Sequence, residues 1–406
     1  MPLGVHQSSN IKNMTNRTNL TFDIQDYKSN PTMDYLQNVN FDIHSYDKIF
    51  NNLDCFDDLC VKYLIDTYFE KGFSPEKYFR DLKYGTDCTI IHYICKYSTP
   101  SSIKHILQIY LEKGFDLQCK TSKNWMPIHY ICRLSTSEMI KYILDIHLEK
   151  GLSINDKVSD CDWCPIHFIC SNKESTLEIV KYIFNIYIEK GLDFEVTCDD
   201  NEWMPIHCIC YYLSFDAIKY IFDLYIEKGL NFETPSHSNK WTPLHIMSCR
   251  KKVLYPIKYV LDMYVEKGLN LEYTNNKGNS SIHYICTYGS FESIKYILDI
   301  YVQKELNLEC PNNEGQSPIH YICTYGSFES VKCILDIYVQ KELNLECVNN
   351  KGQSPIHLIC RYNSSESVKY ILDIYAQKGL RLDGTVRDLI KKYRSSEIIK
   401  IADKML

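Results

Sequence analysis

The repeating unit of this chain is clearest in Ser317-Pro-Ile-His-Tyr-Ile-Cys323, which is followed by Ser330-Val-Lys-Cys-Ile-Leu-Asp-Ile-Tyr338. Closely similar stretches recur along most of the 406 residues, and each carries a histidine at the same place. These histidines are His92, His129, His167, His207, His245, His283, His320 and His357. Successive histidines lie 37, 38, 40, 38, 38, 37 and 37 residues apart. A period of this length predicts stacked supersecondary units rather than one globular core.

Each copy predicts a short helix, a turn and a longer helix. A Ser or Thr often precedes a Pro at the start of the first helix, because Ser caps a helix and Pro suits its first turn. The second helix of the sixth copy has apolar residues at positions i, i+3, i+4, i+7 and i+8, which form one helix face. These residues are Ile294, Ile297, Leu298, Tyr301 and Val302. Many copies end this helix with a glycine, such as Gly268, which favours the left-handed end of a helix.

This pattern resembles the ankyrin repeat, a helix-turn-helix unit with the motif Thr-Pro-Leu-His. Thr242-Pro243-Leu244-His245 matches the motif residue for residue, and eight similar tetrapeptides occur in phase over roughly residues 84–383. The resemblance implies an all-α solenoid of about eight long repeats with a cap at each end. The predicted repeats are 84–120, 121–158, 159–198, 199–236, 237–274, 275–311, 312–348 and 349–383. The predicted caps are 45–83 and 384–406, whereas residues 1–44, rich in Asn, Ser, Thr and Asp, predict a disordered tail.

Two features depart from the ankyrin pattern. The family period is about 33 residues, but here the second helix has about four extra residues, close to one helical turn. An added turn keeps the buried face in register, so we expect a taller outer helix. Seven copies have Cys three residues after His, where the family usually has Ala; Cys is also small and readily buried. These are Cys95, Cys132, Cys170, Cys210, Cys286, Cys323 and Cys360. The long second helix and the Ile-, Asn-, Lys- and Tyr-rich composition are similar to ankyrin proteins of giant viruses that infect amoebae.

The composition argues against several classes of function. The net charge is −6 and is spread without blocks, so we expect no nucleic-acid partner. No run approaches the length of apolar sequence that spans a membrane, so we expect no membrane association. The 19 cysteines and the absence of a secretion signal predict reduced thiols in the cytoplasm, or in the host cytoplasm if the protein is viral. We expect a monomer.

The repeated histidines and cysteines favour a structural role over metal binding or catalysis. A zinc site needs about four ligands, whereas each His-x-x-Cys pair offers two and neighbouring helices pack about 8–10 Å apart. In the ankyrin family this histidine forms hydrogen bonds within the stack, and the resemblance implies the same here. Cys161 and Cys164 form a lone CxxC pair without a second pair at a suitable spacing. With no phosphate-binding loop and no nucleophile elbow, we expect no enzymatic activity, no metal and no cofactor.

The candidate binding residues are aromatic. The four tryptophans, each four residues before a repeat histidine, are Trp125, Trp163, Trp203 and Trp241. A second set, five residues after the histidine, is Tyr97, Tyr212, Tyr288, Tyr325 and Tyr362. In the ankyrin family the first position projects onto the concave face and the second borders the same groove. The resemblance therefore implies contact with a protein partner, such as a host protein. In the alternative interpretation, the Trp rings pack flat on neighbouring loops and stiffen the stack.

The function predicted from the sequence is a non-enzymatic scaffold or adaptor that binds a protein on the concave face of an ankyrin stack. The alternative is a structural or virion-associated repeat protein without a defined partner. The aromatic positions discriminate between these two functions. A purely structural protein does not need exposed tryptophan rings at the same position of successive repeats.

Overall fold

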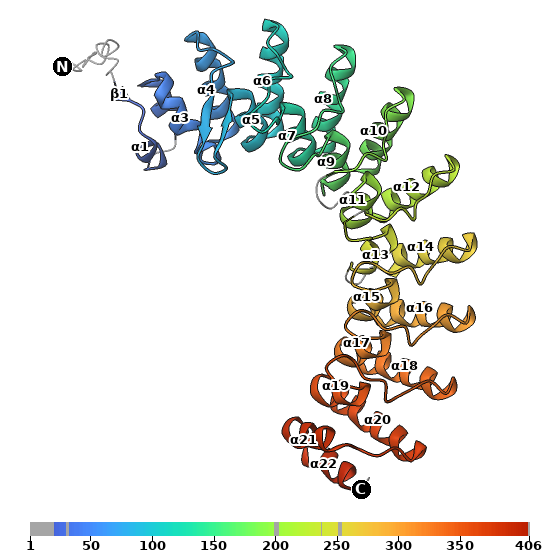
Figure 1. The fold of residues 1–406 in the computed structure, drawn as a ribbon. Coiled ribbons are helices and arrows are strands. Elements are labelled where there is room, and N and C mark those ends of the chain that lie inside the picture. Colours follow the sequence, from blue (N-terminus) through green and yellow to red (C-terminus); the bar gives the residue numbers. More distant parts are fainter. Residues whose placement is uncertain (1–19, 30–31, 199–202, 237, 251–253, 405–406) are drawn as a thin grey trace, which may run out of the picture. The chain divides into compact units, whose positions relative to one another are not determined.

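The computed structural model of the protein describes residues 20–29, 32–198, 203–236, 238–250 and 254–404 (Figure 1). These residues form 22 α-helices, a short 3-10 helix and two two-stranded sheets. The chain divides into two compact units, Met1–Ile183 and Phe184–Leu406. Within each unit, pairs of helices follow one another along the chain and pack on their neighbours, which confirms the predicted all-α repeat fold.

In the first unit, each predicted repeat consists of a short helix followed by a longer one. The pairs are α5 (Ile90–Tyr97) with α6 (Pro100–Lys113), α7 (Pro127–Leu134) with α8 (Ser137–Glu149), and α9 (Pro165–Ser171) with α10 (Leu177–Glu189). The division between the two units falls inside α10. The short helices α5, α7 and α9 pack on one another in order, and each of α5 and α7 also packs on its own long helix.

The second unit has the same arrangement. Its pairs are α11 (Pro205–Tyr212) with α12 (Phe215–Glu227), α13 (Pro243–Ser248) with α14 (Leu254–Lys267), α15 (Ser281–Tyr288) with α16 (Phe291–Gln303), α17 (Pro318–Tyr325) with α18 (Phe328–Gln340), and α19 (Pro355–Tyr362) with α20 (Ser365–Lys378). A last pair, α21 (Gly384–Tyr393) and α22 (Ser396–Asp403), lies where the sequence predicts capping helices. The short helices form one layer and the long helices a second (Figure 1). None of the helices in the described ranges combines the length and the apolar character of a membrane span.

The repeat histidine explains where each short helix begins. In α15, Nδ1 of His283 accepts a hydrogen bond from the backbone N–H of Ser280 at 3.1 Å, which satisfies a donor that the helix start leaves free. Because Nδ1 accepts, the neutral ring carries its proton on Nε2, which donates to the Cys310 carbonyl at 3.1 Å. Both contacts recur at His92, His129, His207, His245 and His320. In these six repeats the histidine therefore ties the helix start to a later loop, which confirms its structural role.

The long helices have 13 or 14 residues, as the extra turn in the sequence predicts. Most of them are followed by a glycine in the left-handed conformation, for example Gly268 at φ 66°. Two repeats have a glutamate there instead, Glu305 and Glu342, and both residues have a φ of 55°. These two positions store backbone strain, because a side chain disfavours this conformation.

We expect Glu342→Gly to stabilise the second unit by about 0.5–1 kcal/mol. The left-handed conformation costs a non-glycine residue about 1–2 kcal/mol, and glycine removes this cost. About half of that gain is lost, because a glycine makes the unfolded chain more flexible and so raises the entropy lost on folding. Space does not limit the reverse exchange, since no described atom lies within 4 Å of a Cβ built at the equivalent Gly379. Urea unfolding followed by circular dichroism measures the change. Gly379→Glu is the reverse control and should destabilise; unchanged midpoints for both variants would show that the strain is absent.

The N-terminal elements differ from the disordered tail predicted for residues 1–44. Part of that prediction, for residues 1–19, 30 and 31, lies outside the described residues. The others form β1 (Leu20–Thr21), α1 (Ile24–Ser29), α2 (Met33–Gln37), β2 (Val39–Asn40) and the start of α3 (Ile43–Phe50), and β1 pairs with β2 in parallel. Phe22, Leu36 and Phe41 are buried, and the Tyr27 ring stacks on Phe56 with centroids 4.4 Å apart. The segment is ordered by this aromatic cluster, which leaves no periodic signal in the sequence.

A β-hairpin lies between the helices of the predicted N-terminal cap and those of the first full repeat. After η1 (Leu53–Cys55) and α4 (Asp58–Glu70), the chain forms β3 (Phe79–Asp81), which pairs antiparallel with β4 (Thr86–Cys88). The turn between the strands ends at Gly85, whose φ of 64° suits glycine. The hairpin lies in the first unit and contributes to its candidate site.

Candidate functional site

The tryptophans predicted to bind a partner are packed against neighbouring rings in the first unit. Trp125 is only 6% exposed, and its indole N–H donates to the Asp160 carboxylate at 3.0 Å. Phe168 lies between the two tryptophan rings, with its centroid 5.0 Å from that of Trp125 and 5.2 Å from that of Trp163. Trp163 itself is half-buried. In this unit the rings connect successive repeats, as the packing interpretation expects.

The two tryptophans of the second unit keep part of their surface exposed. Trp203 is half-buried, with its ring centroid 5.7 Å from that of Tyr211. Trp241 is half-buried, with its ring centroid 4.9 Å from that of Tyr284. Each ring therefore combines packing on one side with some exposed surface.

The predicted tyrosines lie at the ends of the short helices and differ in exposure. The exposed ones are Tyr288, Tyr325 and Tyr362. Tyr212 is half-buried. Tyr97 is half-buried and its hydroxyl donates to the Asp81 carboxylate at 2.9 Å, so its role is partly structural.

Tyr97 and Trp125 line the same pocket in the first unit, which we call the hairpin pocket. It has a volume of about 280 Å³, and its lining comes from the β3–β4 hairpin, the ends of α5 and α7, and the loops before α7 and α9. Four lining residues are aromatic: Tyr84, Tyr97, Trp125 and Tyr130. The charged ones are Lys96, Lys123, Arg133 and Asp160. The pocket is therefore a small aromatic concavity with mixed charge.

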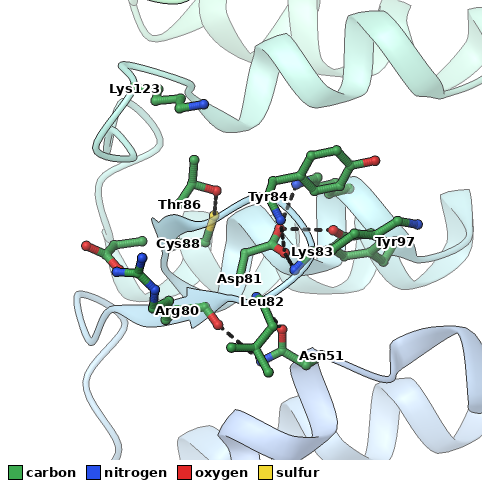
Figure 2. A network of polar contacts seen from close by, with 12 residues as sticks. Asn51, Arg80, Asp81, Leu82, Lys83, Tyr84, Thr86, Cys88, Tyr97 and Lys123 are labelled. Atoms are coloured by element: carbon green, nitrogen blue, oxygen red, sulfur yellow. Dashed lines mark hydrogen bonds and ion pairs between the residues drawn. The ribbon is translucent and has the colours of Figure 1, made fainter.

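Asp81 holds the hairpin in place and is only 1% exposed (Figure 2). One carboxylate oxygen accepts hydrogen bonds from the backbone N–H groups of Lys83 at 2.9 Å and Tyr84 at 3.2 Å. The other accepts from the Lys96 ammonium at 2.6 Å and the Tyr97 hydroxyl at 2.9 Å. Burial alone would raise the pKa of Asp81, but the bonds from Lys96 and Tyr97 outweigh it and hold the pKa below its ordinary value. The Lys96 ammonium also lies 3.7 Å from the centroid of the Tyr84 ring.

The remaining charges of the hairpin pocket leave an unmatched cation. Asp160, which binds the Trp125 indole, also lies 4.0 Å from the Lys123 ammonium. Arg133 lies 5.4 Å from the centroid of the Trp125 ring and forms no ion pair with a described residue. Leu134, next to it, is 52% exposed. The exposed Arg133 guanidinium thus lies beside an exposed apolar side chain and has no ion pair among the described residues.

Tyr288 and Tyr325 line a second pocket, of about 400 Å³, in the second unit. Its lining is mainly polar. The side-chain amide of Asn312 donates to Oδ1 of Asn279 at 2.8 Å and approaches the Tyr321 hydroxyl at 2.9 Å, and both asparagines are buried. These groups bind one another, so this part of the polar lining is already matched.

The repeat cysteines and histidines do not form a metal centre in the described part of the chain, where no group of three or more His, Cys, Asp or Glu side chains is placed to hold an ion. All seven repeat cysteines are buried, and burial raises the pKa of each thiol. They fill apolar gaps as protonated thiols. Cys164 of the CxxC pair is buried, with its sulfur 3.1 Å from Nδ1 of His167.

Residues 299–381 match the model of the ankyrin repeat family, in three copies. This stretch of the chain is similar to ankyrin repeats. The matched stretch includes α17 to α20, and ahead of it the same pairing of short and long helices, with the same histidine contacts, extends through the first unit from α5. Comparison with curated proteins finds no match.

Two solved ankyrin domains illustrate the likeness. The ankyrin repeat domain of Bcl-3, a member of the IκB protein family, is 13% identical, with 61% of this chain and 98% of that chain covered and a TM-score of 0.42. The human ASB11 ankyrin repeat domain is 15% identical, with 62% of this chain and 97% of that chain covered and a TM-score of 0.46.

Three residues of the hairpin pocket, Tyr84, Lys96 and Arg133, are not predicted from the ankyrin pattern. The available signal was the connection over residues 74–87, which is longer than those between the other repeats. Asp81 and Gly85 within it are typical turn residues. The pairing of Asp81 with Lys96 and Tyr97 depends on the folded hairpin and leaves no trace in the repeat period.

Proposed function

We propose that this ankyrin chain is a non-enzymatic scaffold or adaptor that binds a protein partner on the concave face of its repeats. The observation that supports this is the recurrence of exposed or half-buried aromatic side chains at two fixed positions of successive repeats. Ankyrin repeats generally mediate protein–protein interactions, and stacked repeats create extended binding surfaces. Aromatic side chains give a large contact area at a low cost in conformational entropy.

The proposed role of each aromatic side chain depends on how much of its surface is exposed. Trp125 supports the wall of the hairpin pocket, because little of its surface is exposed. Tyr325 and Tyr362 are the best candidates for direct contact, since more than half of each side chain is exposed. Trp163 and Trp203 would contribute the exposed parts of their rings.

We extend the proposal to origin, location and assembly. The composition and the long second helices are similar to those of ankyrin proteins of giant viruses that infect amoebae, which would make the partner a host protein and the location the host cytoplasm. We propose a monomer without nucleic-acid partners. A structural or virion-associated protein without a partner is the alternative, but it gives no reason for exposed aromatics at recurrent positions.

Removing the candidate aromatic side chains should abolish capture of the main partner. Affinity capture from a lysate of the native cells, followed by quantitative mass spectrometry, compares the intact protein with two double variants, Trp163→Ala with Trp203→Ala and Tyr325→Ala with Tyr362→Ala. We expect at least one double variant to reduce enrichment of the partner by roughly tenfold or more, as loss of central interface aromatics does. The matched control is Tyr255→Ala, an even more exposed tyrosine on α14 outside the two predicted positions.

Thermal melts of the same variants separate binding from packing. The tyrosine variants should melt like the intact protein because their rings are exposed, whereas the tryptophan variants should melt a few degrees lower because half of each ring is packed. If both double variants still capture the partner, the aromatic positions do not form the binding surface. If no protein is enriched over the control by the intact chain, the partnerless alternative is correct.

A further inference from the structure

We propose that the hairpin pocket of the first unit binds a partner segment in which a carboxylate stands next to a large apolar side chain. The inference rests on the proposed scaffold function and names the chemistry of the partner. Its basis is the combination, in one pocket, of aromatic walls, an unpaired guanidinium and exposed apolar side chains.

The charge of the pocket selects an anion. Its lining has three cationic side chains, Lys96, Lys123 and Arg133, and one carboxylate, Asp160. Asp81 neutralises Lys96, with the carboxylate oxygen 2.6 Å from the ammonium nitrogen. Asp160 already accepts a hydrogen bond from the Trp125 indole N–H and lies close to the Lys123 ammonium. Arg133 therefore remains without an anion among the described residues, although the whole chain carries a net charge of −6. A guanidinium presents two parallel N–H groups to a carboxylate, which makes it the better carboxylate ligand of the two cation types.

The apolar part of the pocket selects a large apolar neighbour for that anion. Leu134 follows Arg133 at the end of α7, and Tyr84 stands on the hairpin; both line the pocket and both are more than half exposed. Large apolar side chains that stay exposed beside a concavity are typical of recognition sites. A volume of about 280 Å³ is near the lower end for ligand pockets and suits one or two side chains of a peptide.

The hairpin wall is ordered before binding. The Leu82 backbone N–H donates to the Asn51 side-chain oxygen at 2.9 Å, and the Asn51 amide donates to the Arg80 carbonyl at 3.2 Å (Figure 2). On the other side of the turn, Asp81 holds the backbone of Tyr84. Because the turn does not have to be ordered when the partner arrives, more of the contact energy is left for affinity.

Single-stranded nucleic acid also binds to aromatic and cationic side chains. The geometry of the hairpin pocket favours a peptide instead. Base stacking needs free ring faces. Here the Lys96 ammonium occupies one face of the Tyr84 ring, 3.7 Å from its centroid, and Trp125 is 6% exposed, with the Tyr130 ring 4.8 Å away. The rings thus form a floor for a side chain and do not offer a stacking platform.

Selection of random peptides displayed on phage, against the full-length protein, tests the proposal. We expect the enriched sequences to place Asp or Glu beside Leu, Ile, Phe or Trp. A synthetic peptide of the most enriched sequence, labelled for fluorescence anisotropy, should bind Arg133→Glu and Arg133→Gln at least roughly tenfold more weakly, as the loss of a charge-assisted hydrogen bond predicts. Replacing its acidic residue by the amide should have the same effect, and Leu134→Ala should weaken binding by a smaller factor.

The matched control is Lys113→Glu, which reverses an exposed charge at the last residue of α6, a helix about 20 Å long whose first residue follows the pocket residue Tyr97 closely in sequence. This variant should bind the peptide as the intact protein does, and circular dichroism of all variants checks that they are folded. Enriched peptides without acidic residues, or an affinity that Arg133→Glu and Arg133→Gln leave unchanged, would refute the proposal while leaving the scaffold function standing. A labelled oligo(dT) that binds more tightly than the peptide, in an Arg133-dependent way, would assign the pocket to nucleic acid instead. The scaffold function has its own test in the tryptophan and tyrosine double variants.

Discussion

Cys323→Asp should lower the free energy of unfolding of the repeats around α17 by about 4 kcal/mol or more. Cys323 has no exposed surface, and α17 packs against α15, α18 and α19. An aspartate in this place would have to take up a proton to avoid a buried charge. At about pH 7, keeping a carboxyl group with an ordinary pKa of about 3.9 neutral costs about 4 kcal/mol, and burying the acid without hydrogen-bond partners adds to that cost.

Two further substitutions separate the buried charge from the loss of the thiol. Cys323→Ala removes only the sulfur and should cost about 1 kcal/mol, since alanine fills most of the same gap. Cys333→Asp places the same acid on the half-buried outer surface of α18 in the same repeat and should cost far less. Urea unfolding followed by circular dichroism gives the free energies. Because each repeat is stabilised only by its neighbours, hydrogen exchange should accelerate first in α15 to α20. Equal midpoints for Cys323→Asp and Cys323→Ala would contradict the burial of this position.

The repeat fold could be predicted because its determinants are local. The Ser317-Pro318 start, the apolar face of α16 and the glycine after each long helix all act within one or two helical turns. The hydrogen bonds of His283 follow from the same local geometry, since its acceptor nitrogen binds the N–H of the cap residue Ser280, only three residues earlier. Each of these local features recurs with the repeat period. One copy alone would indicate the fold only weakly, but eight copies in phase indicate it strongly.

The burial of the tryptophans and the hairpin pocket depend on contacts that are distant in sequence. Trp125 is buried because Phe168, 43 residues later, fills the space beside its ring. Phe168 stands where other repeats have Tyr, Cys, Ile or Leu, so the period alone did not identify it. The hairpin is fixed by Asp81 with Lys96 and Tyr97, which belong to different elements. Non-periodic residues with tertiary partners are the ones that a repeat pattern does not predict.

The protein should lose stability steeply as the pH falls from about 6.5 to about 4. Burial lowers the pKa of five repeat histidines to about 4: His92, His129, His207, His245 and His283. In the unfolded chain a histidine binds its proton near pH 6.5. The stability that comes from burying the neutral rings is therefore complete above about pH 6.5, is lost as the unfolded state takes up protons, and is gone below about pH 4. Each ring contributes on the order of 3 kcal/mol over this range.

The structure explains why the protonated ring does not fit. Nδ1 of His283 accepts the Ser280 backbone N–H, and a protonated Nδ1 cannot accept it, so the start of α15 would lose its cap. Burial raises the pKa of Glu195 and Glu233, which act in the opposite direction, but two half-exposed carboxyl groups do not offset five buried rings. Carboxylates with a lowered pKa, such as Asp81, lose their contribution only at lower pH. The loss of stability between about pH 6.5 and 4 is therefore caused mainly by the histidines.

Urea unfolding at several pH values between about 7.5 and 4.5 measures this dependence as the slope of the unfolding free energy against pH. His283→Gln should be less stable at neutral pH. Its unfolding free energy should nevertheless change less steeply with pH, because one fewer proton is taken up on unfolding. Cys286→Ala, in the same helix, should also be less stable but should keep the full slope, because it removes no titrating group. Equal slopes in the two variants, or equal stability at about pH 7 and pH 5, would mean that the rings are protonated in the folded protein. The hydrogen bonds to Nδ1 that begin each short helix could not then exist, so the slope tests the feature on which the whole stack of repeats depends.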